Sequence, residues 1–444
     1  MRKRSLLALV IAALSPAGLR AQDGAPLPLS FAAAVSRAAG GAPLITLAGL
    51  RTDEARARVR EARAPLLPGL SATGSWVNQT LNKDALGFQF PSLPGFPSGK
   101  RIGPFDLVDA RLRVTQTLFD YAGIVRVRAA RSQLAGVQAD SGLAAESAVQ
   151  ATALAYLKTL RARAIVAARQ ADSALAAELV RLAQAQQDAG VGTAIDVTRA
   201  RTQLVAAVGG LVLARNLEER ARIDLARTLG LEPDTPLELT DTLAGALPLA
   251  ELPAARDSLV ALALERRHDL AAEQARGFAA RRAGSAISAE RLPRVDLSAN
   301  YGANGLSFGE AIATRLIAVQ VTVPILDGLR RESRQAEQQA AVRASDVRLA
   351  ELRRQVAADV DAARLDLSSA EQQQAIAIDR LQLAQQELDQ SRERFTAGVA
   401  GNIEVINAQL SFVRARDADI DARFAAAVAR VALARAVGVA RLLH

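Results

Sequence analysis

The chain has 444 residues, a formal net charge of +9, no cysteine and only 3% aromatic residues. The absence of cysteine excludes disulfides and thiolate metal sites. Basic residues alternate with acidic ones, which is typical of solvated helix faces and argues against a nucleic-acid partner. The abundance of alanine favours long, closely packed helices over a large globular core.

Residues 1–21, MRKRSLLALVIAALSPAGLRA, predict a secretory signal peptide. They combine a basic start, a short apolar centre and small residues before an expected cleavage site after Ala21. No later stretch reaches about 18 consecutive apolar residues, so we expect no transmembrane helix. The mature protein is then either soluble in the periplasm or crosses an outer membrane as β-strands.

Two segments with a two-residue apolar period predict one β-hairpin each, at 69–119 and 294–325. The first has a long loop rich in glycine, proline and phenylalanine, and the second a short one. The polar positions along these strands that we expect to share one face are Asp109, Arg111, Arg113, Asn300 and Asn304.

After each hairpin comes a proline-free tract, at 122–189 and 328–398, that predicts a very long helix. In the second tract Ala363, Ala370, Ala377 and Ala384 repeat every seven residues, and Leu381, Leu388 and Phe395 form a neighbouring row. A 3.5-residue period indicates helices that supercoil around partners. About 70 residues would give a helix on the order of 100 Å long.

Each long helix is expected to stop at a glycine, Gly190 or Gly398, where a left-handed cap forms easily. A second helix follows each turn, at 194–230 and 402–440.

The turns belong to an internal repeat, because AGVGTAIDV at 189–197 returns as AGVAGNIEV at 397–405. We therefore predict two structural halves, 22–230 and 257–444, each with a helix, a hairpin, a long helix and a final helix. The proline-rich segment 231–256 is predicted to be the linker between them.

Alternation alone fits either membrane strands or a soluble, half-buried sheet. The aromatics favour the membrane, because nine of them lie in or beside the hairpins; Trp76, Phe105 and Tyr301 are our candidate membrane-boundary residues. Four strands cannot close a barrel in lipid without open edges, so two, three or four copies must share one barrel. Its bore would be lined by the five polar positions given above.

The chain resembles the TolC family of outer-membrane factors in the order and spacing of several motifs. These are LPLSFAAAVSRA near the start, ARAPLLPGLSATGSW at 63–77, TLFDYAG and PILDGLR after the hairpins, ERRHDL at 265–270, and the repeated turns. The resemblance implies a homotrimer with a twelve-stranded barrel in the outer-membrane lipid and a long helical barrel in the periplasm. It also implies a tip that meets a periplasmic adaptor protein and an inner-membrane transporter.

The resemblance further implies roles for residues at the two turns. Asp196, Glu404 and Asn407 stand at the periplasmic aperture, where Asn407 replaces a second acid of some relatives. The adaptor-docking surface would include Gly190, Val191, Phe395, Gly398 and Val399. Two alternatives stay open from the residues: the acids could simply stabilise helix N-termini, and Phe395 could continue the coiled-coil row.

The leading interpretation is an exit duct of a tripartite efflux pump. Type I protein secretion shares the architecture, and a periplasmic coiled-coil scaffold without a pore is the alternative from another class. We predict no enzyme activity, cofactor or metal, because the only histidines are His268 and His444 and GVG at 190–192 lacks a nucleotide-loop context.

Overall fold

The computed structural model describes residues 27–82, 85, 101–245, 253–399 and 401–442. The predicted signal peptide, the loop residues Phe88, Phe90 and Phe96, and part of the predicted linker lie outside the described residues.

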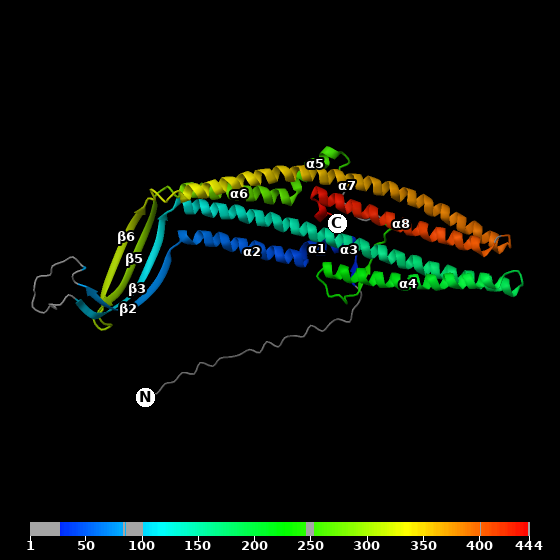
Figure 1. Cartoon of the computed structure of the whole chain (residues 1–444), viewed down its shortest axis with the longest axis horizontal. Coiled ribbons are helices and arrows are strands. Elements are labelled where there is room, and N and C mark those ends of the chain that lie inside the picture. Colours follow the sequence, from blue (N-terminus) through cyan, green and yellow to red (C-terminus); the bar gives the residue numbers. More distant parts are fainter. Residues whose placement is uncertain (1–26, 83–84, 86–100, 246–252, 400, 443–444) are drawn as a thin grey trace, which may run out of the picture. The chain divides into compact units, whose positions relative to one another are not determined.

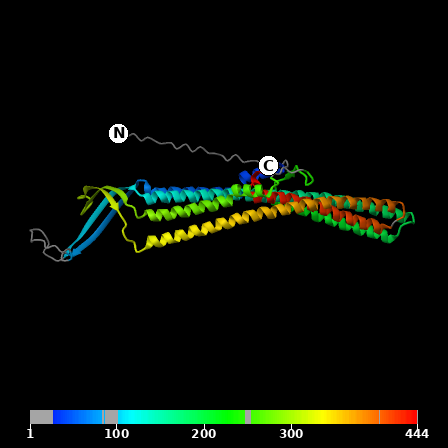
Figure 2. The same ribbon diagram turned by 90° about the horizontal axis from the view of Figure 1, so that it is seen from above.

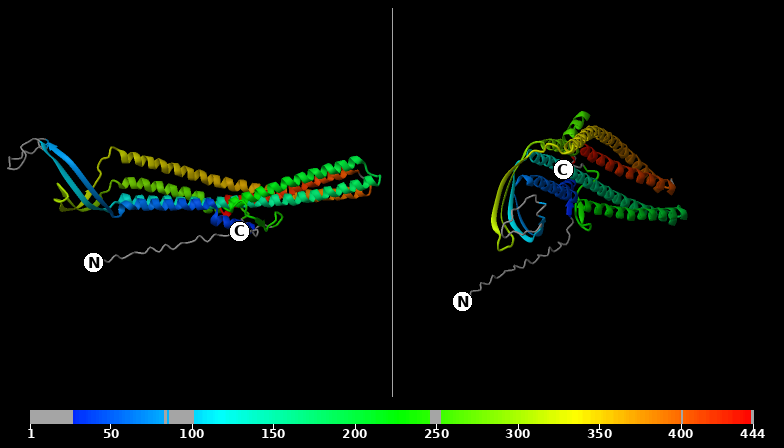
Figure 3. Two further views of the ribbon diagram at one scale, coloured as in Figure 1. Left: turned by 90° about the horizontal axis from the view of Figure 1, so that it is seen from below. Right: turned by 60° about the vertical axis from the view of Figure 1, so that its left-hand side comes forward.

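Four strands form one antiparallel sheet in the order β2-β3-β5-β6 (Figure 1). Their bounds are β2 Gly69–Asn82, β3 Arg101–Phe119, β5 Arg294–Gly305 and β6 Ile312–Thr322. The two hairpins are joined through β3 and β5, which run antiparallel from Val108 opposite Gly305 to Phe119 opposite Val295. The sheet is curved (Figure 3), and β2 and β6 form its edges.

Four long helices carry most of the chain. They are α3 Tyr121–Asp188, α4 Ala194–Thr228, α7 Arg330–Thr396 and α8 Asn402–Val437. The shorter helices are α1 Phe31–Gly41, α2 Pro43–Arg63, η1 Ala64–Leu66, α5 Arg256–Arg266, α6 His268–Ala289 and η3 Ala440–Leu442. Gly209 and Gly210 lie inside α4 without interrupting it.

The chain divides into two compact units. The first comprises Met1–Ala34, Thr152–Pro248 and Gln374–Phe424; the second comprises Val35–Ala151, Leu249–Gln373 and Ala425–His444. In the first unit, α3 turns into α4 and α7 turns into α8 (Figure 2). In the second unit, Ala370 of the predicted alanine row packs against Ala426 and Ala429 of α8. Small residues here let the two helices approach closely, as the seven-residue spacing indicates.

Four helices end in the same Schellman cap. At the tip turn, the Gly190 N–H donates to the Gln187 carbonyl at 3.0 Å and the Val191 N–H to the Gln186 carbonyl at 3.0 Å. Each capping glycine has positive φ: 77° at Gly190, 72° at Gly398, 68° at Gly230 and 78° at Gly438. The same number of positions separates Gly190 from Gly398 and Gly230 from Gly438.

A small cluster of contacts in the first unit anchors the start of the described chain. Strand β1 (Leu27–Leu29) pairs in parallel with β4 (Leu237–Leu239). The carboxylate of Asp241 accepts the Phe31 N–H at 2.6 Å, at the start of α1, and the Tyr156 hydroxyl at 2.8 Å. The rings of Phe31 and Tyr156 pack edge to face with centroids 5.7 Å apart.

One described segment, Phe31–Leu66, contains a window apolar enough to cross a membrane, with a hydropathy of 1.3. This value is a mean over a window that includes polar residues, so the expectation that no run of about 18 consecutive apolar residues follows the signal peptide is not contradicted. The backbone leaves the helical region at Ala42, where ψ is 142°, so the segment is divided between α1 and α2. A bilayer-spanning helix must keep its backbone hydrogen bonds unbroken through the hydrocarbon, so the break at Ala42 argues against a single membrane-spanning helix here.

Candidate functional site

The strand register sorts the sheet into a polar and an apolar face. Residues directly opposite each other across an antiparallel pair lie on the same face. Arg113 is opposite Ser71 on one side and Asn300 on the other, and Asp109 is opposite Ser75 and Asn304. All five polar positions singled out in the sequence therefore share one face, together with Thr115 and Ser298.

The other face is exposed and largely apolar, although it also carries Arg315 of β6. Leu112 is opposite Ala72 and Tyr301, and Tyr301 is opposite Arg315. Large exposed hydrophobic residues of this face are Leu70, Trp76, Leu112, Val114, Tyr301, Ile317, Val319 and Val321. A contiguous apolar surface of this kind marks contact with a membrane or a partner.

The three candidate boundary aromatics do not share a face. Trp76 and Tyr301 lie on the apolar face and are each 64% exposed. Phe105 is opposite Gln79, on the face that carries Asp109. Beyond Trp76 the polarity of the faces reverses, because Asn78 donates to the Asp106 carboxylate at 2.8 Å on the Trp76 side. Phe105 therefore cannot belong to the same aromatic boundary as Trp76.

On the polar face, Arg111 is held by Asp109. Its Nε lies 2.6 Å from Asp109 Oδ1, and a second guanidinium nitrogen contacts Oδ2. Gly302, directly opposite Arg111, makes room for this side chain. A Cβ added at Gly302 would lie 2.3 Å from both the Ala110 carbonyl oxygen and the Arg111 Cβ.

The acids at the two tip turns are both partnered within the chain. The Asp196 carboxylate accepts the Thr193 N–H at 3.3 Å and the Thr193 hydroxyl, closing a capping box at the start of α4. Glu404 Oε1 lies 3.1 Å from Arg394 Nε, across the turn between α7 and α8. Asn407 is exposed on α8. Both acids sit in a first helical turn, so the helix-stabilising alternative holds for their local geometry.

The exposed apolar residues at the tip come in matched pairs. Val191 and Val399, the residues after the capping glycines, are 79% and 69% exposed. Ile195 and Ile403 repeat the pattern one helical turn later and are also exposed. Neither isoleucine is among the tip residues predicted from the sequence, although both occupy equivalent places in the repeated stretches.

Phe395 is not part of this exposed set. It is 4% exposed and lies in a core cluster with Leu179 of α3, Leu388 of α7, and Val405 and Ala408 of α8. Its side chain cannot offer a docking surface, so that assignment is wrong and the packing alternative is the right one. The reason is its register, seven residues after Leu388 on the buried side of α7.

Comparison with known proteins identifies the family. The family model for outer membrane efflux proteins matches residues 34–231 and 259–439. The chain belongs to the outer membrane efflux protein family. This confirms the resemblance to outer-membrane factors, and it makes the chain a transport protein of the outer membrane whose helical part lies in the periplasm.

The individual relatives share less than 30% sequence identity with this chain. OpmQ of Pseudomonas aeruginosa, a pyoverdine export outer membrane protein, is 25% identical over 399 residues, which is 87% of this chain and 80% of that protein. BepC of Brucella suis, an outer membrane efflux protein, is 29% identical over 273 residues, which is 58% of this chain and 56% of that protein.

The fold is that of solved outer-membrane channels. The outer-membrane channel OprN superposes with a TM-score of 0.75 at 19% identity, covering 92% of this chain and 89% of that one. VceC from Vibrio cholerae superposes with a TM-score of 0.73 at 20% identity, covering 92% and 96%. The relatives are thus channel and efflux proteins rather than enzymes.

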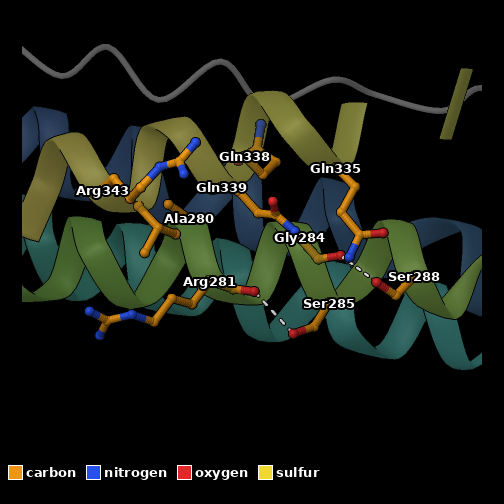
Figure 4. Close-up of a pocket in the computed structure, with 10 residues that line it drawn as sticks. Ala280, Arg281, Gly284, Ser285, Ser288, Gln335, Gln338, Gln339 and Arg343 are labelled. Carbon is orange, nitrogen blue, oxygen red and sulfur yellow. Dashed lines mark hydrogen bonds between the residues drawn. The ribbon is translucent and has the colours of Figure 1, made fainter. Parts of the chain in front are cut away.

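A groove with a volume of about 540 Å³ lies between α6 and α7 (Figure 4). Its α6 wall combines Arg281 with small residues, and the Ser285 hydroxyl donates to the Arg281 carbonyl of its own helix at 3.0 Å. Glutamines of α7, including Gln335 and Gln338, form the facing wall. Across the described residues, no group of three or more His, Cys, Asp or Glu side chains could hold a metal ion.

Proposed function

We propose that this chain forms a trimeric outer-membrane exit duct of a tripartite efflux pump. The duct conducts solutes passively from an inner-membrane transporter and its periplasmic adaptor to the exterior. The observation that carries the proposal is the two-faced sheet with two open edges.

The open edges require sister copies. In hydrocarbon, each unpaired backbone group costs several kcal/mol, so β2 and β6 cannot both stay unpaired. Because β2 and β6 run in opposite directions, β6 of one copy can pair antiparallel with β2 of the next. Three copies give twelve strands, between the eight whose interior is filled by side chains and the sixteen that enclose a water channel.

The two faces of the sheet support a proposed inside and outside of the barrel. The apolar face with Trp76 and Tyr301 suits lipid, and the face with Asp109, Arg111 and Arg113 suits water. Membrane strands alternate in this way, apolar outward and polar toward the lumen. The reverse orientation would place charged side chains in lipid at a cost of about 2–4 kcal/mol each near the midplane.

We also propose that the two tip turns are structural repeats with one shared role. The two halves, 22–230 and 257–444, end their paired helices in the same caps, and the turns expose Val191, Val399, Ile195 and Ile403 at equivalent places. Three copies would present six such turns. The exposed aliphatic pairs then form the adaptor-docking surface, and Asp196, Glu404 and Asn407 line the aperture.

The cargo is a small molecule rather than a folded protein. Two of the relatives are a pyoverdine export protein and an efflux protein, which favours small-molecule efflux over type I protein secretion. A non-pore scaffold would leave the exposed apolar face of the sheet without a role.

Neighbouring cysteine variants test the duct directly, because the chain contains no cysteine of its own. Thr73 lies on the polar face and Ala72 on the apolar face of β2. In planar bilayers we expect the purified oligomer to conduct. A bulky thiol reagent should reduce the single-channel conductance of the Thr73→Cys variant and leave that of the Ala72→Cys control unchanged. Water-soluble protein without conductance would support the scaffold instead.

A further inference from the structure

The polar face of the sheet carries one arginine without a counter-charge. A row here means the residues directly opposite one another across the sheet. In the rows between Phe105 and the strand ends that lead into the helices, the charged residues of this face are Asp109, Arg111, Arg113, Arg294 and Asp296. Asp109 holds Arg111, and Arg294 Nε lies 2.8 Å from Asp296 Oδ2. Asp296 also accepts the Thr117 hydroxyl at 2.9 Å. Within the described part of the chain, Arg113 has no ion pair or side-chain hydrogen bond.

Apart from Arg111, whose charge is paired with Asp109, the surroundings of Arg113 are neutral. Ser71 and Asn300 are directly opposite it. The adjacent rows hold Thr115 and Ser298 toward the helices, and Thr73 and Gly302 beside Arg111 toward the loops. The nearest carboxylates of this face lie two rows away on either side, and each is bonded to its own arginine. Arg113 is an exposed residue, so its side chain is accessible to a solute.

The acids at the tip do not offset this charge. Glu404 is paired with Arg394 at 3.1 Å, and Asp196 lies 3.8 Å from Arg199 besides capping α4. An acidic ring favours cations only in so far as its charge is uncompensated, and rings of arginine or lysine favour anions.

Resting on the proposed duct, we infer that Arg113 is an anion-attracting residue of the bore, which makes the duct more permeable to small anions than to small cations. Three copies place three uncompensated guanidinium groups around one water-filled section. At about 10 Å in water and 0.1 M salt, three unit charges raise the concentration of monovalent anions about twofold and lower that of monovalent cations about twofold. The ratio of anion to cation permeability therefore rises about fourfold.

The test is the reversal potential of the full-length oligomer in planar bilayers under a potassium chloride gradient. We expect chloride to permeate better than potassium in the wild type, and the preference to fall about fourfold in Arg113→Gln. Arg113→Lys keeps the charge and should keep the preference. Arg315→Gln is the matched control, because Arg315 is an exposed arginine of the same sheet on the apolar face.

The outcomes separate this inference from the duct on which it rests. A conducting channel whose permeability ratio is the same in the wild type and in Arg113→Gln overturns the role of Arg113 and leaves the duct standing. A wild-type preference for potassium does the same. Loss of the preference in Arg315→Gln alone would assign it to the other face. A wild-type oligomer without conductance overturns the duct and this inference together.

Discussion

The burial of Phe395 makes a quantitative prediction about the tip. Its ring packs among Leu179, Leu388 and Val405, so Phe395→Ala removes a large side chain from a cluster shared by three helices. Truncation of a buried phenylalanine costs about 3–5 kcal/mol. If the tip opens locally, its amide hydrogens should exchange faster by about two to three and a half orders of magnitude. Hydrogen exchange of tip peptides in the assembled oligomer measures this change.

Val399→Ala is the matched control. Val399 lies in the same turn but is exposed, so its truncation should change local stability by less than about 0.5 kcal/mol. Under the proposed function it should instead weaken adaptor binding. Unchanged hydrogen exchange at the tip of Phe395→Ala, together with loss of adaptor binding, would contradict a packing role for Phe395.

Three further predictions follow from single residues. Gly398→Ala should destabilise the tip by about 1–2 kcal/mol, because φ is 72° at this position; the cost comes from the backbone alone, since the added Cβ meets nothing within 4 Å. Gly209→Ala, inside α4 and in equally open space, should instead stabilise the protein. Thermal melting measures both changes. Gly302→Val should prevent assembly of heat-resistant oligomers on gels, whereas Gly74→Val, with no neighbour within 4 Å, should assemble. Burial, with the charges of Arg441 and Arg435, lowers the pKa of His268 below its ordinary 6.5. Stability from His268 is therefore fully present above about pH 6.5 and lost as the pH falls through the folded-state pKa. The melting temperature of the wild type should fall with pH across this range, and His268→Gln should lose this pH dependence. An unchanged pH dependence in His268→Gln would contradict the lowered pKa.

Patterns with a short period were readable from the sequence. The two-residue alternation around Asp109 and Arg113 gave the faces of β3, because neighbouring side chains of a strand must point to opposite sides. Gly190 and Gly398 marked the helix ends, because a residue with positive φ is needed there. These features depend on local geometry alone.

Features that depend on side-chain partners were not readable. From the sequence, Phe395 fitted a docking surface and the core equally well. Only the packing of α3, α7 and α8 decides which side of α7 is covered. Pairing of Glu404 with Arg394 spans a turn whose geometry no propensity specifies. Phe105 was chosen because aromatics are generally associated with membrane boundaries, but the register of β3 places it on the face of Asp109, opposite to that of Trp76.

The central claim is that the edges of the sheet are closed by sister copies, and cross-linking tests it most directly. Ser75 on β2 and Ala318 on β6 share the polar face and belong to the two edge strands. A chain carrying Ser75→Cys and Ala318→Cys, treated with a flexible bismaleimide in outer membranes, should give a covalent ladder that stops at three chains. Each single-cysteine variant is the control and should give at most covalent pairs. Cross-linking confined within single chains, or a ladder that ends at another number, would contradict the shared twelve-stranded barrel.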